Sequence, residues 1–177
     1  MELTIKDAAV RLGRNAGAFG ALVLGVSEEQ ARWKPEPAQW SVLEVVNHLA
    51  DEEAEDFRRR LELTLFHPGE AWPGIDPQQW AVARAYNERD LPASLGRFLD
   101  ERERSIEWLA GLPEDVDLGR SYQHPTAGTL RAGDLLASWV AHDLIHIRQL
   151  NRLHYRWLER MAAQATPPRR LDYAGPF

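Results

Sequence analysis

The sequence predicts an all-α protein that folds as a four-helix bundle. Four segments of bundle length place apolar residues at the helical period of 3.6, and the stretches between them are rich in proline and glycine. No segment of useful length alternates apolar and polar residues as a half-buried strand does. At 177 residues, with 44% hydrophobic and 27% charged residues, the chain has the size and composition of one globular domain.

The first helix is expected over residues 4–23. Thr4 and Asp7 stand at the spacing of a capping box, in which each residue's side chain binds the backbone N–H of the other. Ser27 begins a second such pattern, which predicts a short helix that stops before Pro35.

A further capping box, Ser41 with Glu44, begins a long second helix that extends to about Phe66. Residues 67–77 contain three prolines and two glycines, which predicts a loop. Residues 78–89 could form a short helix.

Pro92 suits the first turn of the third main helix, whose apolar face continues to Leu109. Residues 113–128 are rich in turn formers and predict another loop. The last long helix is expected from about Leu130 to Ala163.

The connection over residues 66–91 is long enough to return the chain to the starting end of the bundle. The second and third helices can then run parallel, which gives the bundle an up-down-down-up order. A plain up-and-down bundle with a decorated loop stays open as an alternative. We expect the bundle over residues 1–166 and a C-terminal tail over residues 167–177, because two prolines, Pro167 and Pro168, end regular structure.

The composition excludes several classes of function. The chain has no cysteine, which excludes disulfides, thiolate zinc sites, iron–sulfur clusters and a cysteine nucleophile. The net charge of −6 argues against a nucleic-acid partner, since a phosphate backbone needs a positive face. No apolar run approaches the roughly 20 residues that span a bilayer, and the N-terminus lacks a signal-peptide core. We expect a soluble, cytoplasmic protein with no nucleic-acid or membrane partner.

Two histidines of the last helix give the sharpest chemical signal. His142 and His146 are one turn apart, so both imidazoles lie on one face. That face also carries Leu135, Trp139 and Leu150, so it points into the bundle. A divalent metal would satisfy two buried ring nitrogens at once. The alternative is a pair of core histidines that donate to backbone carbonyls or to waters.

A third metal ligand would have to come from another element. His67 and His124 lie in predicted loops, and His154 lies well round the last helix. His48 lies inside the second helix, which a bundle can bring against the last one. On a helical wheel His48 falls at the edge of the apolar stripe. That position suits a ligand at the rim of an open pocket, and it equally suits a surface histidine.

Polar neighbours extend this candidate site. Glu52 is one turn from His48 and could ligate a metal, orient the imidazole or act as a base. Gln149 shares the histidine face of the last helix, and Asp51 and Asp143 could act in similar ways.

The acidic run over residues 51–56 has a simpler interpretation, a solvated helix face. Glu53 stands apart because it falls on the central apolar stripe of its helix. A buried carboxylate needs a donor, so we expect Glu53 to hold a structural hydrogen bond or salt bridge.

The second and last helices resemble those of the DinB/YfiT-like superfamily. The segment WSVLEVVNHLADEE, residues 40–53, resembles the helix that carries the first metal histidine in that superfamily. The segment GTLRAGDLLASWVAHDLIHIRQL, residues 128–150, resembles its last helix, which supplies the other two. The resemblance covers nearly the whole chain and leaves only the C-terminal tail unmatched.

This resemblance implies the up-down-down-up bundle and a metal triad of His48, His142 and His146. Glu52 and Gln149, by their positions on the two helices, are the candidates to contact those ligands. Three neutral imidazoles leave a divalent ion open positions, and zinc and nickel both suit imidazole ligands. The superfamily includes thiol-dependent S-transferases, a mycothiol-dependent isomerase and proteins labelled as hydrolases.

The resemblance therefore implies a metal-dependent enzyme that acts on a small-molecule substrate, with thiol transfer ahead of hydrolysis. The first reaction needs a low-molecular-weight thiol cosubstrate at the metal, and the second needs an activated water. No feature of the sequence names a catalytic residue. Two alternatives stay open: a non-enzymatic metal- or ligand-binding bundle with a role in stress response or partner binding, and an empty site. Members of the superfamily often dimerise, so a homodimer is a further expectation.

Overall fold

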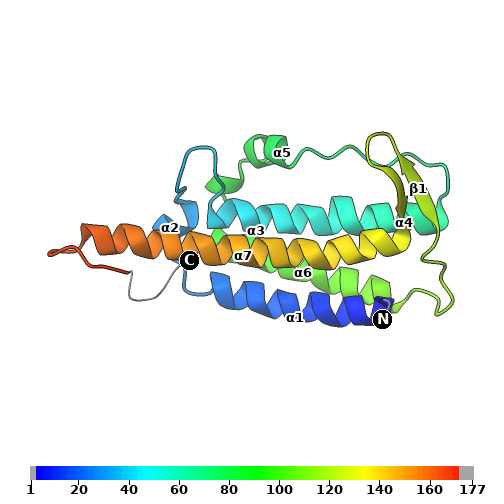
Figure 1. Ribbon diagram of the computed structural model, residues 1–177, viewed down its shortest axis with the longest axis horizontal. Coiled ribbons are helices and arrows are strands. Elements are labelled where there is room, and N and C mark those ends of the chain that lie inside the picture. The colour runs from blue at the N-terminus through cyan, green and yellow to red at the C-terminus, as the bar shows by residue number, and fades with distance from the viewer. Residues whose placement is uncertain (1–2, 172–177) are drawn as a thin grey trace.

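Four long helical stretches lie side by side in the computed structural model, which describes residues 3–171 (Figure 1). The stretches are α1 (Ile5–Val23), a continuous run of α3 (Val42–Asp51), η1 (Glu52–Phe57) and α4 (Arg58–Phe66), then α6 (Leu91–Ala110) and α7 (Ala132–Gln164). The all-α four-helix bundle predicted from the apolar periodicity is confirmed. No helix in the described range is long and apolar enough to cross a membrane. Of the predicted tail, residues 172–177 lie outside the described residues.

The predicted starts of the first three long helices are also confirmed. Thr4 Oγ1 accepts a hydrogen bond from the backbone N–H of Asp7, and Ser41 Oγ accepts one from the backbone N–H of Glu44, each at 3.1 Å. In both boxes the acidic side chain accepts from the backbone N–H of the capping residue in return. Pro92 lies in the first turn of α6.

Shorter elements occupy the connections. They are α2 (Glu28–Arg32), α5 (Pro77–Ala83), the 3₁₀ turn η2 (Tyr86–Glu88) and the strands β1 (Ser121–His124) and β2 (Gly128–Arg131). The two strands pair antiparallel in a hairpin, so the prediction of a loop over residues 113–128 was wrong at this point. Four-residue strands are too short to show a period of two in the sequence. Because β2 continues to Arg131, α7 begins at Ala132, two residues after the predicted start.

Contacts between helices give their directions. Asn47 of α3 donates to Ser94 of α6, and Arg58 of α4 donates to Ser105 further along α6. The residue numbers rise together, so these two stretches run parallel. The colour gradient of Figure 1 shows α1 and α7 running the opposite way. The long connection between α4 and α6 returns the chain along the bundle and makes this arrangement possible.

The core consists of two apolar clusters separated by a polar layer. One cluster includes Phe19, Phe98 and Leu150, and the other includes Leu12 and Leu109. Each long helical stretch contributes to both clusters and carries polar residues between them. These residues are the half-buried Asn15 in α1 and the buried Asp51, Glu52, Glu53 and Asp56 in the second stretch, Arg102 in α6, and Asp143 and His146 in α7.

Candidate metal centre

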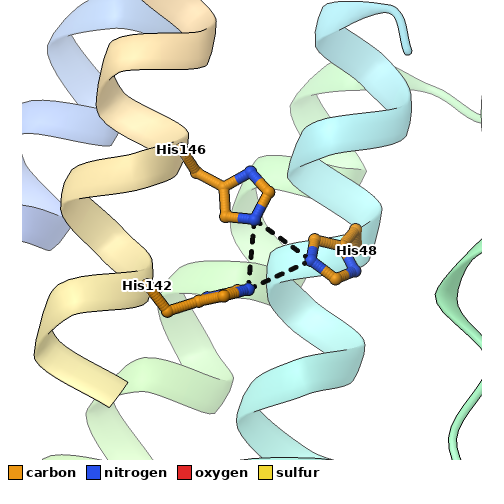
Figure 2. A group of neighbouring side chains, drawn as sticks. All are labelled: His48, His142 and His146. Carbon is orange, nitrogen blue, oxygen red and sulfur yellow. Dashed lines mark hydrogen bonds between the residues drawn. The ribbon is translucent and has the colours of Figure 1, made fainter. Parts of the chain in front are cut away.

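Three imidazole rings converge between α3 and α7 (Figure 2). His48 belongs to α3, and His142 and His146 belong to successive turns of α7. The Nε2 atom of His48 lies 3.2 Å from the Nε2 atoms of both other rings, and those two are 3.1 Å apart. The structure therefore brings together the three histidines singled out in the sequence. His48 is 4% exposed, so it is not a surface residue.

These three nitrogens cannot satisfy one another by hydrogen bonding alone. An Nε2 atom carries either a proton or a lone pair, so in any set of three at least two are alike. At least one contact then joins two lone pairs or two protons. A divalent cation resolves this conflict, because it accepts all three lone pairs. Nitrogens placed tetrahedrally at about 2.0–2.1 Å from zinc are roughly 3.3 Å apart, close to the separations in the protein.

Burial keeps the rings in the neutral form that binds metals. It lowers the pKa of His48 to about 2, with the nearby His146 and His142 rings adding to the effect. It lowers the pKa of His142 to about 3, helped by His146 and by the cation of Arg102. Burial also lowers the pKa of His146.

Gln149 fixes the orientation of the ring of His146 through a hydrogen bond. The side-chain carbonyl oxygen of Gln149 lies 2.7 Å from Nδ1 of His146 and accepts a hydrogen bond from the N–H group there. The proton on Nδ1 leaves the lone pair on Nε2, which faces the other two rings. Such outer contacts fix the tautomer of metal-binding histidines. Gln149 therefore contacts one of the three histidines from outside the cluster.

Glu52 lies near Nδ1 of His48, the ring nitrogen that does not face the other two histidines. Its Oε1 atom lies 3.5 Å from Nδ1 of His48, and neither of these buried atoms has a hydrogen-bond partner within the described residues. Burial raises the pKa of Glu52 to about 9, and a hydrogen bond and the charge of Asp56 raise it further. Arg60 approaches the same Asp56 at 2.7 Å. At neutral pH Glu52 therefore holds a proton, which makes it an acid rather than a base.

Aromatic side chains form walls around the triad. Trp40 packs edge-on against His48, with ring centroids 4.7 Å apart, and lies parallel to the ring of His146 at 6.5 Å. The ring centroids of Phe57 and His142 are 5.1 Å apart. These apolar contacts restrict the rotation of the imidazoles and reduce their exposure to water.

The triad opens into a cavity of about 620 Å³. Besides the three histidines, its lining includes Trp40, Glu52, Gln78, Gln149, Arg152 and Arg156. This volume is in the range of cavities that bind small molecules. In the described part of the chain, no fourth histidine, aspartate or glutamate joins the cluster. A metal held here would keep positions free for a ligand from the cavity.

A buried ion network lies next to the triad in the polar layer. The guanidinium of Arg102 donates to both carboxylate oxygens of Asp143, at 2.6 and 2.7 Å, and lies 2.7 Å from Oε1 of Glu53. The indole of Trp139 donates to the same Glu53 oxygen at 2.7 Å. The structural role expected for Glu53 is confirmed, and Asp143 is directed at Arg102 rather than at the triad.

The solvated interpretation of the acidic run was wrong. Asp51, Glu52, Glu53 and Asp56 are all buried, while Glu55 is exposed. Cations from distant elements compensate the buried carboxylates. Asp51, for example, is bonded to Arg84, which precedes η2, and to Arg97 of α6.

The acidic run also changes the form of its helix. Residues 52–57 adopt a π-helical turn, in which the hydrogen bonds span one residue more than in an α-helix. The extra residue rotates the following side chains, and Phe57 packs against both Trp139 and His142. Such turns are frequent at functional sites. The apolar periodicity gave no sign of this turn.

Sequence reasoning missed two arginines of the cavity. Arg152 and Arg156 follow Gln149 by three and seven residues in the same helix, so they could have been found by following the face that carries the histidines for two more turns.

The fold and the cluster together define a four-helix bundle with a candidate three-histidine metal centre. The model of the DinB superfamily matches residues 11–150. The chain belongs to the DinB superfamily.

Two similar proteins carry names that concern metals. A protein of Oceanobacillus iheyensis named "Putative metal-dependent hydrolase" is 25% identical over 133 residues, which are 74% of each chain. YfiT from Bacillus subtilis is described as "a probable metal-dependent hydrolase with an unusual four-helix bundle topology". Its structure matches with a TM-score of 0.76 and 22% identity, over 86% of this chain and 87% of that one. This likeness shows the fold.

Proposed function

We propose that the protein is a metal-dependent enzyme in which His48, His142 and His146 hold one divalent ion, zinc or nickel. The observation that carries this proposal is the convergence of three neutral Nε2 atoms on one point beside an open cavity. A divalent ion held by three imidazoles supplies a Lewis acid with open positions, which lowers the pKa of a nucleophile bound there.

The surrounding residues would orient and protect the reacting groups. Gln149 keeps the proton of His146 on Nδ1. Trp40 and Phe57 limit the access of water to the rings. Glu52 lies beside the same cavity and holds a proton at neutral pH in the metal-free protein, so it is the candidate proton donor to a leaving group.

Hydrolysis is the reaction that the names of both similar proteins support. Thiol transfer is the second candidate, and the size of the cavity favours it, because about 620 Å³ accommodates a low-molecular-weight thiol beside a substrate. The chain has no cysteine, so the thiol would have to be a cosubstrate. Turnover without any thiol would favour hydrolysis, and selective stimulation by a bacterial thiol would favour transfer.

A non-enzymatic metal-binding bundle would be favoured by a fourth protein ligand that closes the coordination sphere. Within residues 3–171, Glu52 does not join the cluster of ligand atoms and is hydrogen-bonded to Asp56 instead. This arrangement favours the enzyme. The small-molecule substrate, the cytoplasmic location and the homodimer stay predictions.

Metal content tests the proposal directly. The protein, purified without a metal-affinity tag, is analysed by mass spectrometry beside a His142→Ala/His146→Ala variant. His67→Ala is the matched control, because this histidine is exposed and lies outside the triad. We expect about one zinc or nickel ion per chain in the wild type and the control, and none in the double variant. A folded wild type that takes up neither metal when they are added would refute the proposal.

A further inference from the structure

Two arginines line the cavity beyond the triad. Arg152 and Arg156 belong to α7, the helix that carries His142 and His146. An α-helix rises 1.5 Å per residue, so Arg152 follows His146 by about 9 Å along the helix and Arg156 follows it by roughly 15 Å. A small molecule at the triad can therefore extend to one or both guanidinium groups.

These cations are available for a ligand. Arg152 has no hydrogen bond or ion pair within the described residues. In the same part of the chain Arg156 has one ion pair, with Glu159 on the same exposed side of the helix at 3.1 Å. Both side chains of that pair are more than a third exposed, and exposed pairs of this kind contribute little energy. Neither arginine is therefore committed to holding the fold together.

The charge of the cavity is opposite to that of the protein. The chain carries a net charge of −6, yet the cavity lining contributes two arginine cations against a single carboxyl group, that of Glu52. Gln39 and Gln78 add side-chain amides that can donate hydrogen bonds. A cationic cavity in an acidic protein concentrates small anions from solution.

We propose that the substrate of this site carries an oxyanion, a carboxylate or a phosphate, which Arg152 binds with help from Arg156 while the reacting group lies at the triad. The inference rests on the proposed function and names its substrate class. The planar guanidinium of arginine donates two parallel hydrogen bonds to either oxyanion. The helix geometry places the oxyanion on the order of 10 Å from the reacting atom.

Chain-length-matched hydroxamates test the inference, because a hydroxamate binds zinc at one end. The probes are suberic acid monohydroxamate, whose carboxylate is at the far end, its uncharged methyl ester, and an analogue that ends in a phosphonate. Zinc-loaded wild type, Arg152→Gln and Arg156→Gln are titrated with each probe by calorimetry. Arg148→Gln is the matched control, because Arg148 is exposed on α7 and outside the cavity lining.

We expect at least one charged probe to bind the wild type and the control about tenfold more tightly than the ester. The ratio of the affinity for the charged probe to the affinity for the ester should fall toward one in Arg152→Gln, and it should fall less in Arg156→Gln. If the carboxylate probe has the larger ratio, the oxyanion of the substrate is a carboxylate; if the phosphonate probe has it, the oxyanion is a phosphate. Equal affinity for all three probes in the wild type would overturn the oxyanion site and leave the metal proposal intact.

Failure of the metal proposal gives a different pattern. If the protein holds no zinc and binds no hydroxamate, inorganic phosphate is added to the metal-free protein and its melting temperature is measured. A stabilisation that Arg152→Gln removes and Arg148→Gln retains would support the oxyanion site without the metal. No stabilisation of the wild type would overturn it.

Discussion

Arg102 is the residue whose replacement tests most directly how the polar layer is held together. It pairs with Asp143 and Glu53, and all three side chains are at most 2% exposed. It also donates to the backbone carbonyl of Leu12 at 3.1 Å, which links α6 to α1. Arg102→Met keeps the apolar stem and removes the charge, so two buried carboxylates lose their cation.

The expected cost follows from this burial. Removing one partner of a buried ion pair costs about 3–5 kcal/mol, because the remaining charge is uncompensated. Two carboxylates are affected, but Asn15 still donates to Asp143 and Trp139 still donates to Glu53. We therefore expect the free energy of unfolding to fall by about 4 kcal/mol. For a domain of this length, that loss lowers Tm by roughly 8–16 °C.

Urea titration followed by tryptophan fluorescence measures this loss. Arg104→Met is the matched control, because Arg104 lies on the same helix with a side chain that is 64% exposed and is paired with Glu101. The control should change the free energy of unfolding by no more than about 0.5 kcal/mol. If Arg102→Met lies within about 1 kcal/mol of the control, the buried network does not stabilise the fold.

Three further predictions concern the candidate metal centre. In the metal-free folded protein the pKa of Glu52 is raised to about 9 from 4.5 for an unperturbed glutamate. The contribution of Glu52 to the stability of that form is therefore present below pH 4.5 and is lost as the pH rises toward 9. Relative to Glu52→Gln, the wild type should lose up to about 1.4 kcal/mol per pH unit between these values in urea titrations; parallel pH profiles would contradict this. Gln149→Ala should weaken zinc binding about tenfold or more in competition with a chelator, because it frees the proton of His146 to move to Nε2; unchanged affinity would remove Gln149 from the site. Zinc at 100 times its Kd should stabilise the wild type by about 2.7 kcal/mol and leave His142→Ala/His146→Ala unchanged in thermal melts; equal shifts would place the zinc elsewhere.

Much of the fold was predictable because its signals are local. The capping boxes at Thr4 and Ser41 depend on residues three positions apart, and both occur as the sequence predicts. The pairing of His142 with His146 depends only on the helical repeat. The hairpin was missed because its strands are too short to show a repeat.

The rest of the site depends on which helices meet, and that information is not local. The edge position of His48 on its helical wheel left a surface histidine equally possible. Its burial comes from α7, which contributes residues more than ninety positions away. Asp51 is likewise surrounded by Arg84 and Arg97, whose proximity no pattern in the acidic run indicates. Only the resemblance to a known family pointed to the meeting of His48 with the other two histidines.

The distribution of stability in the bundle explains how it can hold such a site. The two apolar clusters lie on either side of the polar layer and supply the hydrophobic stabilisation. In and beside this layer, some buried atoms have no hydrogen-bond partner among residues 3–171, including Nδ1 of His48 and Oε1 of Glu52, and each such atom costs on the order of 1–3 kcal/mol. These costs lie beside the triad, where binding of a cation can offset them. A bundle stabilised at both ends can keep its ligand-binding groups in position before the ligand arrives, which reduces the reorganisation that binding requires.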